Sequence, residues 1–166
     1  LPIETTHLSG YLKFGCVSIR ECFYKMKKQF GKRDPLIRQL IWRDFFKNIS
    51  MKYGNKIFKI GGILEKDYQW ITDIKIFNKW INGLTNEPFV NANMLELKYT
   101  GWMSNRGRQN VASYLAKELN LDWRWGARYF ESQLIDYDVH SNYGNWMYVS
   151  GAVSYTHLRA HETPLH

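Results

Sequence analysis

Apolar positions in this chain recur mainly at helical spacing, and strand-like alternation is scarce. The sequence therefore predicts an all-α fold of several helices. Residues that cap helix starts precede several apolar segments, among them Ser18, Asp73, Asp122 and the pair Asp34-Pro35. With Ser104 or Asn105 as a further start, these signals predict helices over 18–30, 34–49, 73–80, 90–99, 104–119 and 122–134.

Two segments are predicted to be loops. Residues 54–62 begin and end with glycine, and residues 136–145 are polar, contain a glycine and lead to Trp146. Both ends are also atypical of a complete protein. The chain begins with Leu1 beside a motif, and 153–163 resembles one reading frame of a sequencing adapter. We therefore interpret 153–166 as a non-native tail and assign 1–152 to the fold, with a genuine tail as the alternative.

Composition narrows the class of protein only slightly. The 166 residues suffice for one domain or a piece of a larger one, and they include 7 Trp and 11 Tyr, which can form a large aromatic core. A net charge of +8 fits a nucleic-acid partner, although a basic surface can also serve solubility alone. Two cysteines without a partner pattern indicate neither a disulfide framework nor a metal site. We expect a monomer with no membrane span and no secretion signal, located in the cytoplasm or, in a eukaryote, in an organelle or the nucleus.

Several motifs follow one another in a recognisable order. The segment 100–113 reads TGWMSNRGRQNVAS and is preceded by TTHLS at 5–9 and LIWRDFF at 40–46. It is followed by DWR at 122–124, DYD at 136–138 and SNYGNW at 141–146. In this order the motifs resemble the photolyase and cryptochrome family, and residues 104–113 resemble its DASH branch.

The resemblance implies a partial FAD-binding helical domain over 1–152. It also implies a separate N-terminal domain that binds an antenna pigment, methenyltetrahydrofolate or deazaflavin. The implied activity is that of a carbon–carbon lyase that repairs cyclobutane pyrimidine dimers with blue light. DNA, preferentially single-stranded, would be the partner. We expect the fragment alone to be inactive and to bind FAD weakly or not at all.

The resemblance assigns a set of residues to the cofactor. Hydroxyls and free amides at a helix start bind anions, but they also make an ordinary helix cap. A buried Arg–Asp pair is costly unless it has a purpose such as holding a flavin, but a purely structural pair has the same pattern. The implied FAD residues are Thr5, Thr6, His7 (Arg in many relatives), Leu8, Ser9, Arg43, Arg108, Asp136, Asp138 and Asn142.

Aromatic residues receive the remaining roles. Trp146, Trp123 and Trp70 match the electron-transfer triad of the family, whereas core packing is the alternative for any single Trp. The implied DNA pocket consists of Gln39, Trp42, Asn105, Gln109 and Tyr148. Gln39 replaces the usual Glu and loses its charge, so we expect binding to survive and repair to fall. The alternative function is therefore a non-repairing blue-light photoreceptor that binds FAD and nucleic acid.

Two further positions depart from the family pattern together. Asn91 and Leu95 stand where relatives have Asp and Arg, four residues apart on one predicted helix. A helical ion pair would be lost as a unit at this spacing. We therefore expect the double change to be compensated rather than damaging.

Overall fold

The computed structural model describes residues 6–32 and 34–152, which form an all-α fold as predicted. Within these ranges the only β contact is an isolated bridge between Ile71 and Leu121. The α-helices are α1 (Leu8–Lys13), α2 (Ile19–Phe30), α3 (Pro35–Tyr53), α4 (Ile74–Ile81), α5 (Pro88–Thr100), α6 (Asn105–Ser113), α7 (Trp123–Gln133) and α8 (Val139–Ser150). The shorter turns are the 3₁₀ helices η2 (Gly54–Phe58) and η3 (Gly62–Leu64) and the π-helix η4 (Tyr114–Glu118).

The predicted capping residues do begin helices. A side-chain oxygen accepts a hydrogen bond from the first turn of the following helix at Ser18, Asp34, Asp73, Ser104 and Asp122. Ser104 rather than Asn105 is therefore the cap of α6, and its Oγ accepts from the amide of Gly107 at 3.0 Å. These bonds satisfy amides that a helix start would otherwise leave unpaired. The helix predicted over 34–49 also continues further, to Tyr53.

The loop prediction for 136–145 is wrong from Val139 onward. Asp138 caps α8 by accepting from the amide of Ser141 at 2.9 Å, and the helix then runs through Trp146 to Ser150. Asp136, Asn142 and Gly144 of this segment are buried, whereas Asn145 is exposed. A Cβ at Gly144 would lie 2.7 Å from Cγ of Phe46, so only a glycine lets α3 and α8 approach this closely. The loop predicted over 54–62 contains all of η2 and the first residue of η3.

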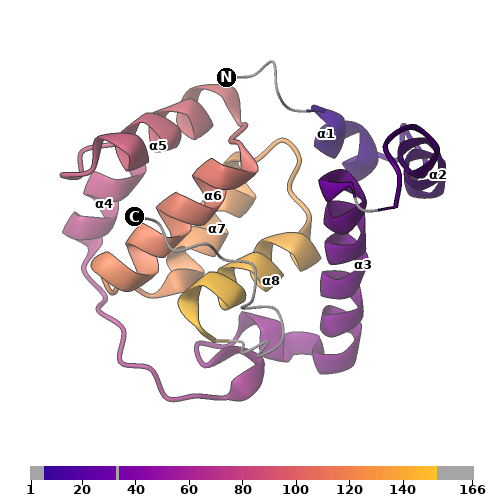
Figure 1. Ribbon diagram of the computed structural model, residues 1–166. Coiled ribbons are helices and arrows are strands. Elements are labelled where there is room, and N and C mark those ends of the chain that lie inside the picture. Colours follow the sequence, from indigo (N-terminus) through magenta and orange to yellow (C-terminus); the bar gives the residue numbers. More distant parts are fainter. Residues whose placement is uncertain (1–5, 33, 153–166) are drawn as a thin grey trace.

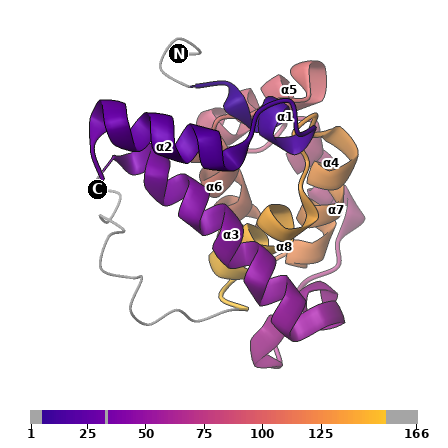
Figure 2. The ribbon, with the colours of Figure 1, turned by 90° about the vertical axis from the view of Figure 1, so that its right-hand side faces the viewer.

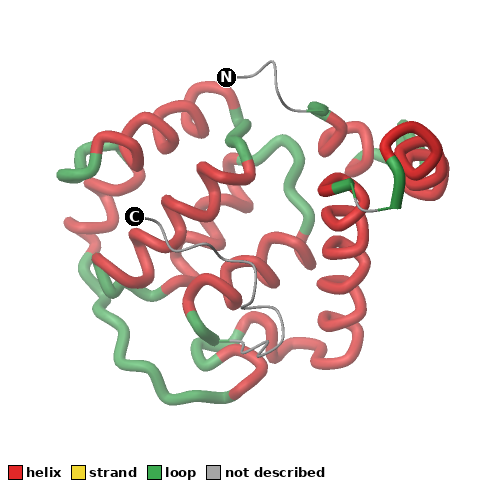
Figure 3. Tube along the Cα trace, viewed as in Figure 1, coloured by secondary structure: helices red, strands yellow, loops and turns green. Residues whose placement is uncertain are grey.

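Helices α6, α7 and α8 lie at the centre of the molecule, with α3 on one side and α4 and α5 on the other (Figure 1). Helices α1 and α2 lie at the upper end of α3, with α2 on the side away from α8 (Figure 1 and Figure 2). A long loop joins η3 to α4 along the lower edge (Figure 3). The main hydrophobic core lies mostly among α4 to α8, and a smaller cluster around Cys22, Met26, Ile37 and Leu40 joins α2 to α3. No helix in the described ranges is long and apolar enough to cross a membrane.

The expected compensation at Asn91 has a visible basis. The Oδ1 atom of Asn91 accepts from the amide of Thr85 at 2.9 Å and from its hydroxyl at 2.6 Å. Its Nδ2 donates to the carbonyl of Thr85 at 2.8 Å. An amide thus fastens the loop before α5 without a charged partner at Leu95.

Candidate functional site

A buried ion pair joins two residues that the motifs single out. Nη2 of Arg108, on α6, lies 2.8 and 3.0 Å from the two carboxylate oxygens of Asp136, just before α8. Nε of Arg108 donates to the carbonyl of Met103 at 2.9 Å. The side chain of Asp136 is only 2% exposed, whereas that of Arg108 is 27% exposed. The guanidinium therefore keeps an accessible face while neutralising a buried carboxylate.

Two more predicted residues, Asp138 and Asn142, follow Asp136 closely in sequence and lie at the start of α8. Burial disfavours the charged form of Asp138, but hydrogen bonds from Ser141 and the positive charges of His140 and Arg43 outweigh it and lower the pKa. Asn142 is buried, and its Nδ2 donates to the carbonyl of Ala127 on α7 at 3.0 Å. This bond fixes the orientation of the amide and leaves its oxygen to accept a hydrogen bond from another group.

A small cavity of about 170 Å³ separates α3 from the start of α8. Its lining consists of Arg43, Lys47, Asp138 and His140. Nδ1 of His140 is buried and has no hydrogen-bond partner among the described residues. Arg43, Lys47 and the unpaired ring nitrogen of His140 are suited to bind a polar, anionic group, although Asp138 also lines the cavity, and the volume admits only a part of a dinucleotide such as FAD.

Two lining residues of this cavity, Lys47 and His140, were not predicted from the sequence. Lys47 lies one helical turn beyond Arg43, and the helical spacing alone could have placed both on one face of α3. His140 fell within the segment predicted to be a loop, so no periodicity pointed to it.

The N-terminal motif is only partly described, because Thr5 lies outside the described residues. The Oγ1 atom of Thr6 accepts a long hydrogen bond from the amide of Leu8, at 3.4 Å. His7 has a left-handed backbone with φ of 50° and stacks on Trp102, with ring centroids 5.3 Å apart. Leu8 and Ser9 begin α1. The N-cap His7 makes no side-chain capping hydrogen bond to α1, and the phosphate role of the motif stays a prediction.

The predicted DNA residues divide between two places. The ring of Trp42 on α3 lies 6.3 Å from that of Tyr148 on α8, and Phe46 supports it at 5.3 Å. Gln39 is exposed one turn earlier on α3. Asn105 and Gln109 are both exposed on α6, a helix that packs against α5, η4 and α8. The structure thus brings Trp42 to Tyr148, whereas no described contact joins Asn105 or Gln109 to them.

The three predicted redox tryptophans differ in exposure. Trp146 is 2% exposed and packs between Trp80, at 6.3 Å, and Phe130, at 5.2 Å. Trp123 is fully buried, and its Nε1 donates to the carbonyl of Ile60 at 3.0 Å. Trp80, another fully buried residue, was not singled out from the sequence, where nothing distinguishes it from other core aromatics.

Trp70 is partly exposed, and the isolated bridge beside it joins the next residue, Ile71, to the segment before α7. The backbone amide of Ile71 donates to the backbone carbonyl of Asn120 at 2.8 Å, and the amide of Asp122 donates to the carbonyl of Ile71 at 3.3 Å. These bonds fix the backbone beside Trp70 next to the start of α7. The order Trp146, Trp123, Trp70 therefore leads from buried to partly exposed positions.

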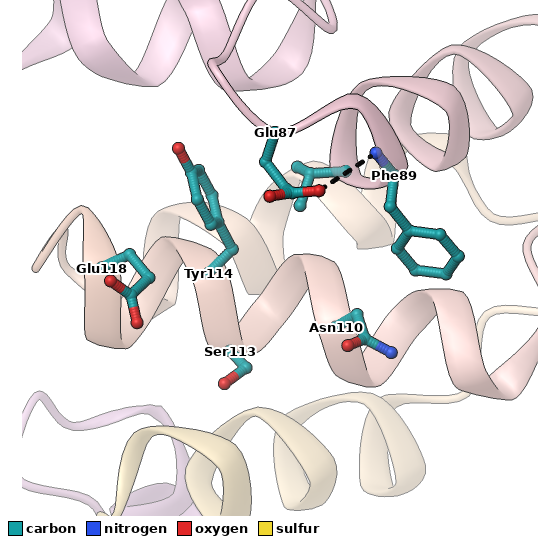
Figure 4. Close-up of a pocket in the computed structure, with 7 residues that line it drawn as sticks. Glu87, Phe89, Asn110, Ser113, Tyr114 and Glu118 are labelled. Atoms are coloured by element: carbon teal, nitrogen blue, oxygen red, sulfur yellow. Dashed lines mark hydrogen bonds between the residues drawn. The ribbon is translucent and has the colours of Figure 1, made fainter. Parts of the chain in front are cut away.

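A larger hollow of about 320 Å³ lies elsewhere, between the start of α5 and the α6–η4 segment (Figure 4). The carboxylate of Glu87 there accepts from the amide of Phe89 at 3.4 Å and so caps α5. The hollow contains none of the predicted site residues. Within the described ranges no three metal-ligating side chains gather. The candidate site therefore lies around α3, α6 and α8.

Known proteins resemble this chain over most of its length. A family model described as the FAD binding domain of DNA photolyase matches residues 36–162, which includes part of the adapter-like stretch. Cryptochrome DASH of Danio rerio is 50% identical over 153 residues, which cover 89% of this chain and 29% of the relative. Cryptochrome DASH of Synechocystis is also 50% identical, over 89% of this chain and 31% of that protein.

Solved structures show the same likeness. The Synechocystis cryptochrome superposes with a TM-score of 0.84 at 49% identity, over 89% of this chain and 32% of that one. A Sulfolobus tokodaii photolyase that holds two FAD molecules superposes with a TM-score of 0.79 at 37% identity. The match covers 89% of this chain and 34% of that one. The chain thus spans about a third of these relatives. It belongs to the photolyase and cryptochrome family and carries part of the helical domain that binds FAD.

Proposed function

We propose that this chain is part of a light-driven enzyme that repairs cyclobutane pyrimidine dimers in DNA, preferentially in single strands. The observation that carries the proposal is the grouping of Arg108, Asp136, Asn142 and Trp146 around α6 to α8. The buried ion pair and the buried amide are polar features that an ordinary helical core does not need. Residues 1–152 form the flavin-binding part, and 153–166 form the non-native tail.

Each polar residue has a defined task toward the cofactor. When bound, reduced FAD supplies the electron that splits the dimer after absorbing blue light. The Arg108 guanidinium provides positive potential that favours a reduced, anionic ring, and Asp136 holds that guanidinium in place. The oxygen of Asn142, whose Nδ2 is held by the carbonyl of Ala127, would interact with the bound cofactor, and a neutral amide tolerates a change of its redox state. Arg43, with its neighbours Lys47 and His140, binds polar groups of the same cofactor.

The tryptophans connect the site with solvent. Trp146 and Trp123 are both buried and Trp70 is partly exposed, so Trp70 forms the outer end of the proposed path. Closely spaced indoles allow an electron to move in short steps from the surface to the cofactor. The dense aromatic packing around Trp146 limits movement of its ring, which supports a fixed path for the electron.

The proposed DNA-binding part consists of the two aromatic rings, the amide of Gln39 one turn before Trp42, and the amides of Asn105 and Gln109 on α6. Trp42 and Tyr148 stack on the flipped dimer, and each base–aromatic stack is worth about 1–3 kcal/mol. Tyr148 offers a smaller surface than a tryptophan and so offsets less of the unstacking cost, which is a few kcal/mol for a duplex. A single strand avoids most of that cost. Gln39, Asn105 and Gln109 supply hydrogen bonds to the bases.

The test is blue-light repair of a dimer-containing single-stranded oligonucleotide by the full-length protein that carries this segment, loaded with reduced FAD. We expect dimer loss that depends on light, with a higher quantum yield in Gln39→Glu. Trp42→Ala should weaken binding of the damaged strand, while flavin absorption stays the same. Normal flavin photochemistry without any dimer loss, in both the parent and Gln39→Glu, would overturn the proposal.

A second candidate function is a blue-light photoreceptor that binds FAD and nucleic acid without repair. Gln39 favours it, because the neutral amide lacks the charge and the transferable proton of the glutamate found in relatives. The outcome that rejects repair in the assay above is the one expected for this photoreceptor.

A further inference from the structure

Tyr143 on α8 contacts both a predicted redox residue and a carboxylate. Its ring meets Trp123 edge-on, with centroids 6.2 Å apart. Its hydroxyl donates to Oε2 of Glu131 at 3.2 Å. Phe58 packs on the same ring at 4.7 Å, and Tyr143 as a whole is only 6% exposed. A buried phenol thus connects the middle indole of the proposed chain to an exposed carboxylate on α7.

The surroundings keep this phenol protonated until it is oxidised. Burial raises the pKa of Tyr143, and the negative charge of Glu131 raises it further, while Arg128 partly opposes them. Loss of an electron makes a phenol strongly acidic, so its oxidation proceeds readily only where a base accepts the proton. Glu131 is such a base, already hydrogen-bonded to the hydroxyl and open to solvent.

We propose that Tyr143 is a redox residue that branches from the tryptophan chain at Trp123. An electron moves from Tyr143 to the Trp123 radical cation, which becomes neutral tryptophan again. The O–H bond of Tyr143 breaks at the same time, and its proton goes to the carboxylate of Glu131. The products are a neutral tyrosyl radical and a carboxylic acid, so charge and atoms balance.

This inference rests on the proposed function, because photoexcited oxidised FAD is the oxidant that first removes an electron from Trp146. The branch slows recombination of the electron on the flavin with the oxidised residue. Return of the electron to Tyr143 also requires return of the proton from Glu131, so recombination becomes slower. A radical stored at Tyr143 is also shielded from solvent, unlike one at Trp70.

Tyr68 also lies beside a predicted redox residue but differs from Tyr143 in its hydrogen-bond partner. Tyr68 lies 5.5 Å from Trp70, so its ring is also next to a predicted redox residue. Its hydroxyl, however, donates to the carbonyl of Gly151 at 2.6 Å, and a peptide carbonyl is too weak a base to accept the proton. Tyr68 therefore provides a matched control, with an indole neighbour and a hydrogen bond but no carboxylate.

The experiment uses laser flashes on the full-length, FAD-loaded protein, with freeze-quench EPR to separate tyrosyl from tryptophanyl radicals. We expect a tyrosyl radical in the parent and in Tyr68→Phe, and none in Tyr143→Phe. Glu131→Gln should slow its formation by roughly 100-fold, the order expected when a proton acceptor is removed. Trp123→Phe should abolish it. Tyr143→Phe keeps the ring packing, and unchanged circular dichroism would exclude misfolding.

A second arm separates this inference from the proposed function. A flash-generated ruthenium(III) polypyridyl complex oxidises tryptophans without the flavin. Tryptophanyl radicals without a tyrosyl radical in the parent, in either arm, would overturn the branch at Tyr143. So would a tyrosyl signal that persists in Tyr143→Phe after flavin excitation. The ruthenium complex also oxidises exposed tyrosines directly, so that arm is judged by the difference between the parent and Tyr143→Phe. If flavin excitation oxidises no tryptophan but the ruthenium arm still yields the Tyr143 radical, the proposed electron path from the tryptophans to the flavin fails and the branch stands. The proposed repair is judged separately, by the loss of dimers.

Discussion

Substituting Gly126 by alanine should destabilise the protein, because the ring of Trp146 occupies the space of a side chain there. A Cβ at this position would overlap with Cη2 of the ring and lie 2.7 and 2.8 Å from Cζ2 and Cζ3. The ring cannot retreat, since Trp80 and Phe130 flank it. Overpacking costs about 1–3 kcal/mol, and we expect the upper end here. Alanine gains about 0.5–1 kcal/mol in a helix interior, which leaves a net loss of about 2 kcal/mol.

Urea denaturation followed by circular dichroism measures this loss. With a slope of about 2 kcal/mol/M, the midpoint of Gly126→Ala should fall by about 1 M. Gly10→Ala is the control, since Gly10 is also helical but no atom lies within 4 Å of the added Cβ. Its midpoint should stay the same or rise slightly. If Gly126→Ala is as stable as Gly10→Ala, Trp146 does not pack on α7 as the structure has it.

Two further predictions concern hydrogen-bonded polar residues. The lowered pKa of Asp138 means that its contribution to stability is present above pH 3.8 and is lost as pH falls through the folded-state pKa below that value. Urea midpoints of Asp138→Asn should therefore fall less than those of the parent on acidification below pH 3.8, and an equal fall would contradict this. Asn91→Ala removes three bonds to Thr85 and should cost about 1–3 kcal/mol in a thermal melt, with the exposed Asn86→Ala as a near-neutral control. Equal melting temperatures for these two variants would show that the bonds do not stabilise the loop.

Local signals were sufficient for most helix starts, because a cap depends on a few adjacent residues. The carboxylate of Asp73 illustrates this, since it accepts from the amides of Lys75 and Ile76 within one turn. Contacts between distant segments follow no such rule. The bond from Arg108 to Asp136 spans 28 residues, and only the resemblance to a family suggested that the two residues meet. The same limit applies to Tyr143, whose importance depends on Trp123 and Glu131 in another helix.

The one large error of the sequence analysis lies in the first half of α8, and its cause is informative. Helical periodicity is visible when apolar residues face the core, but here Asn142 and Gly144 face inward and Asp138 caps the helix. This helix is stable because residues of neighbouring helices fill the space beside its glycine and hydrogen-bond its buried polar side chain. Phe46 fills the space above Gly144, and the carbonyl of Ala127 receives the amide of Asn142.

A fold retains this conflict between local pattern and burial only where polar atoms are needed inside, which is typical of a functional site. The segment that the pattern misassigned is therefore the segment where the cofactor should be sought. Its two ends agree with that inference. At one end, the unpartnered Nδ1 of His140 lines the cavity beside Arg43, and at the other, Trp146 is locked against α7. Replacing Asn142 with an apolar residue of similar size would give α8 a clearer helical pattern of apolar positions. The same change would remove the buried polar group that the proposed cofactor site requires.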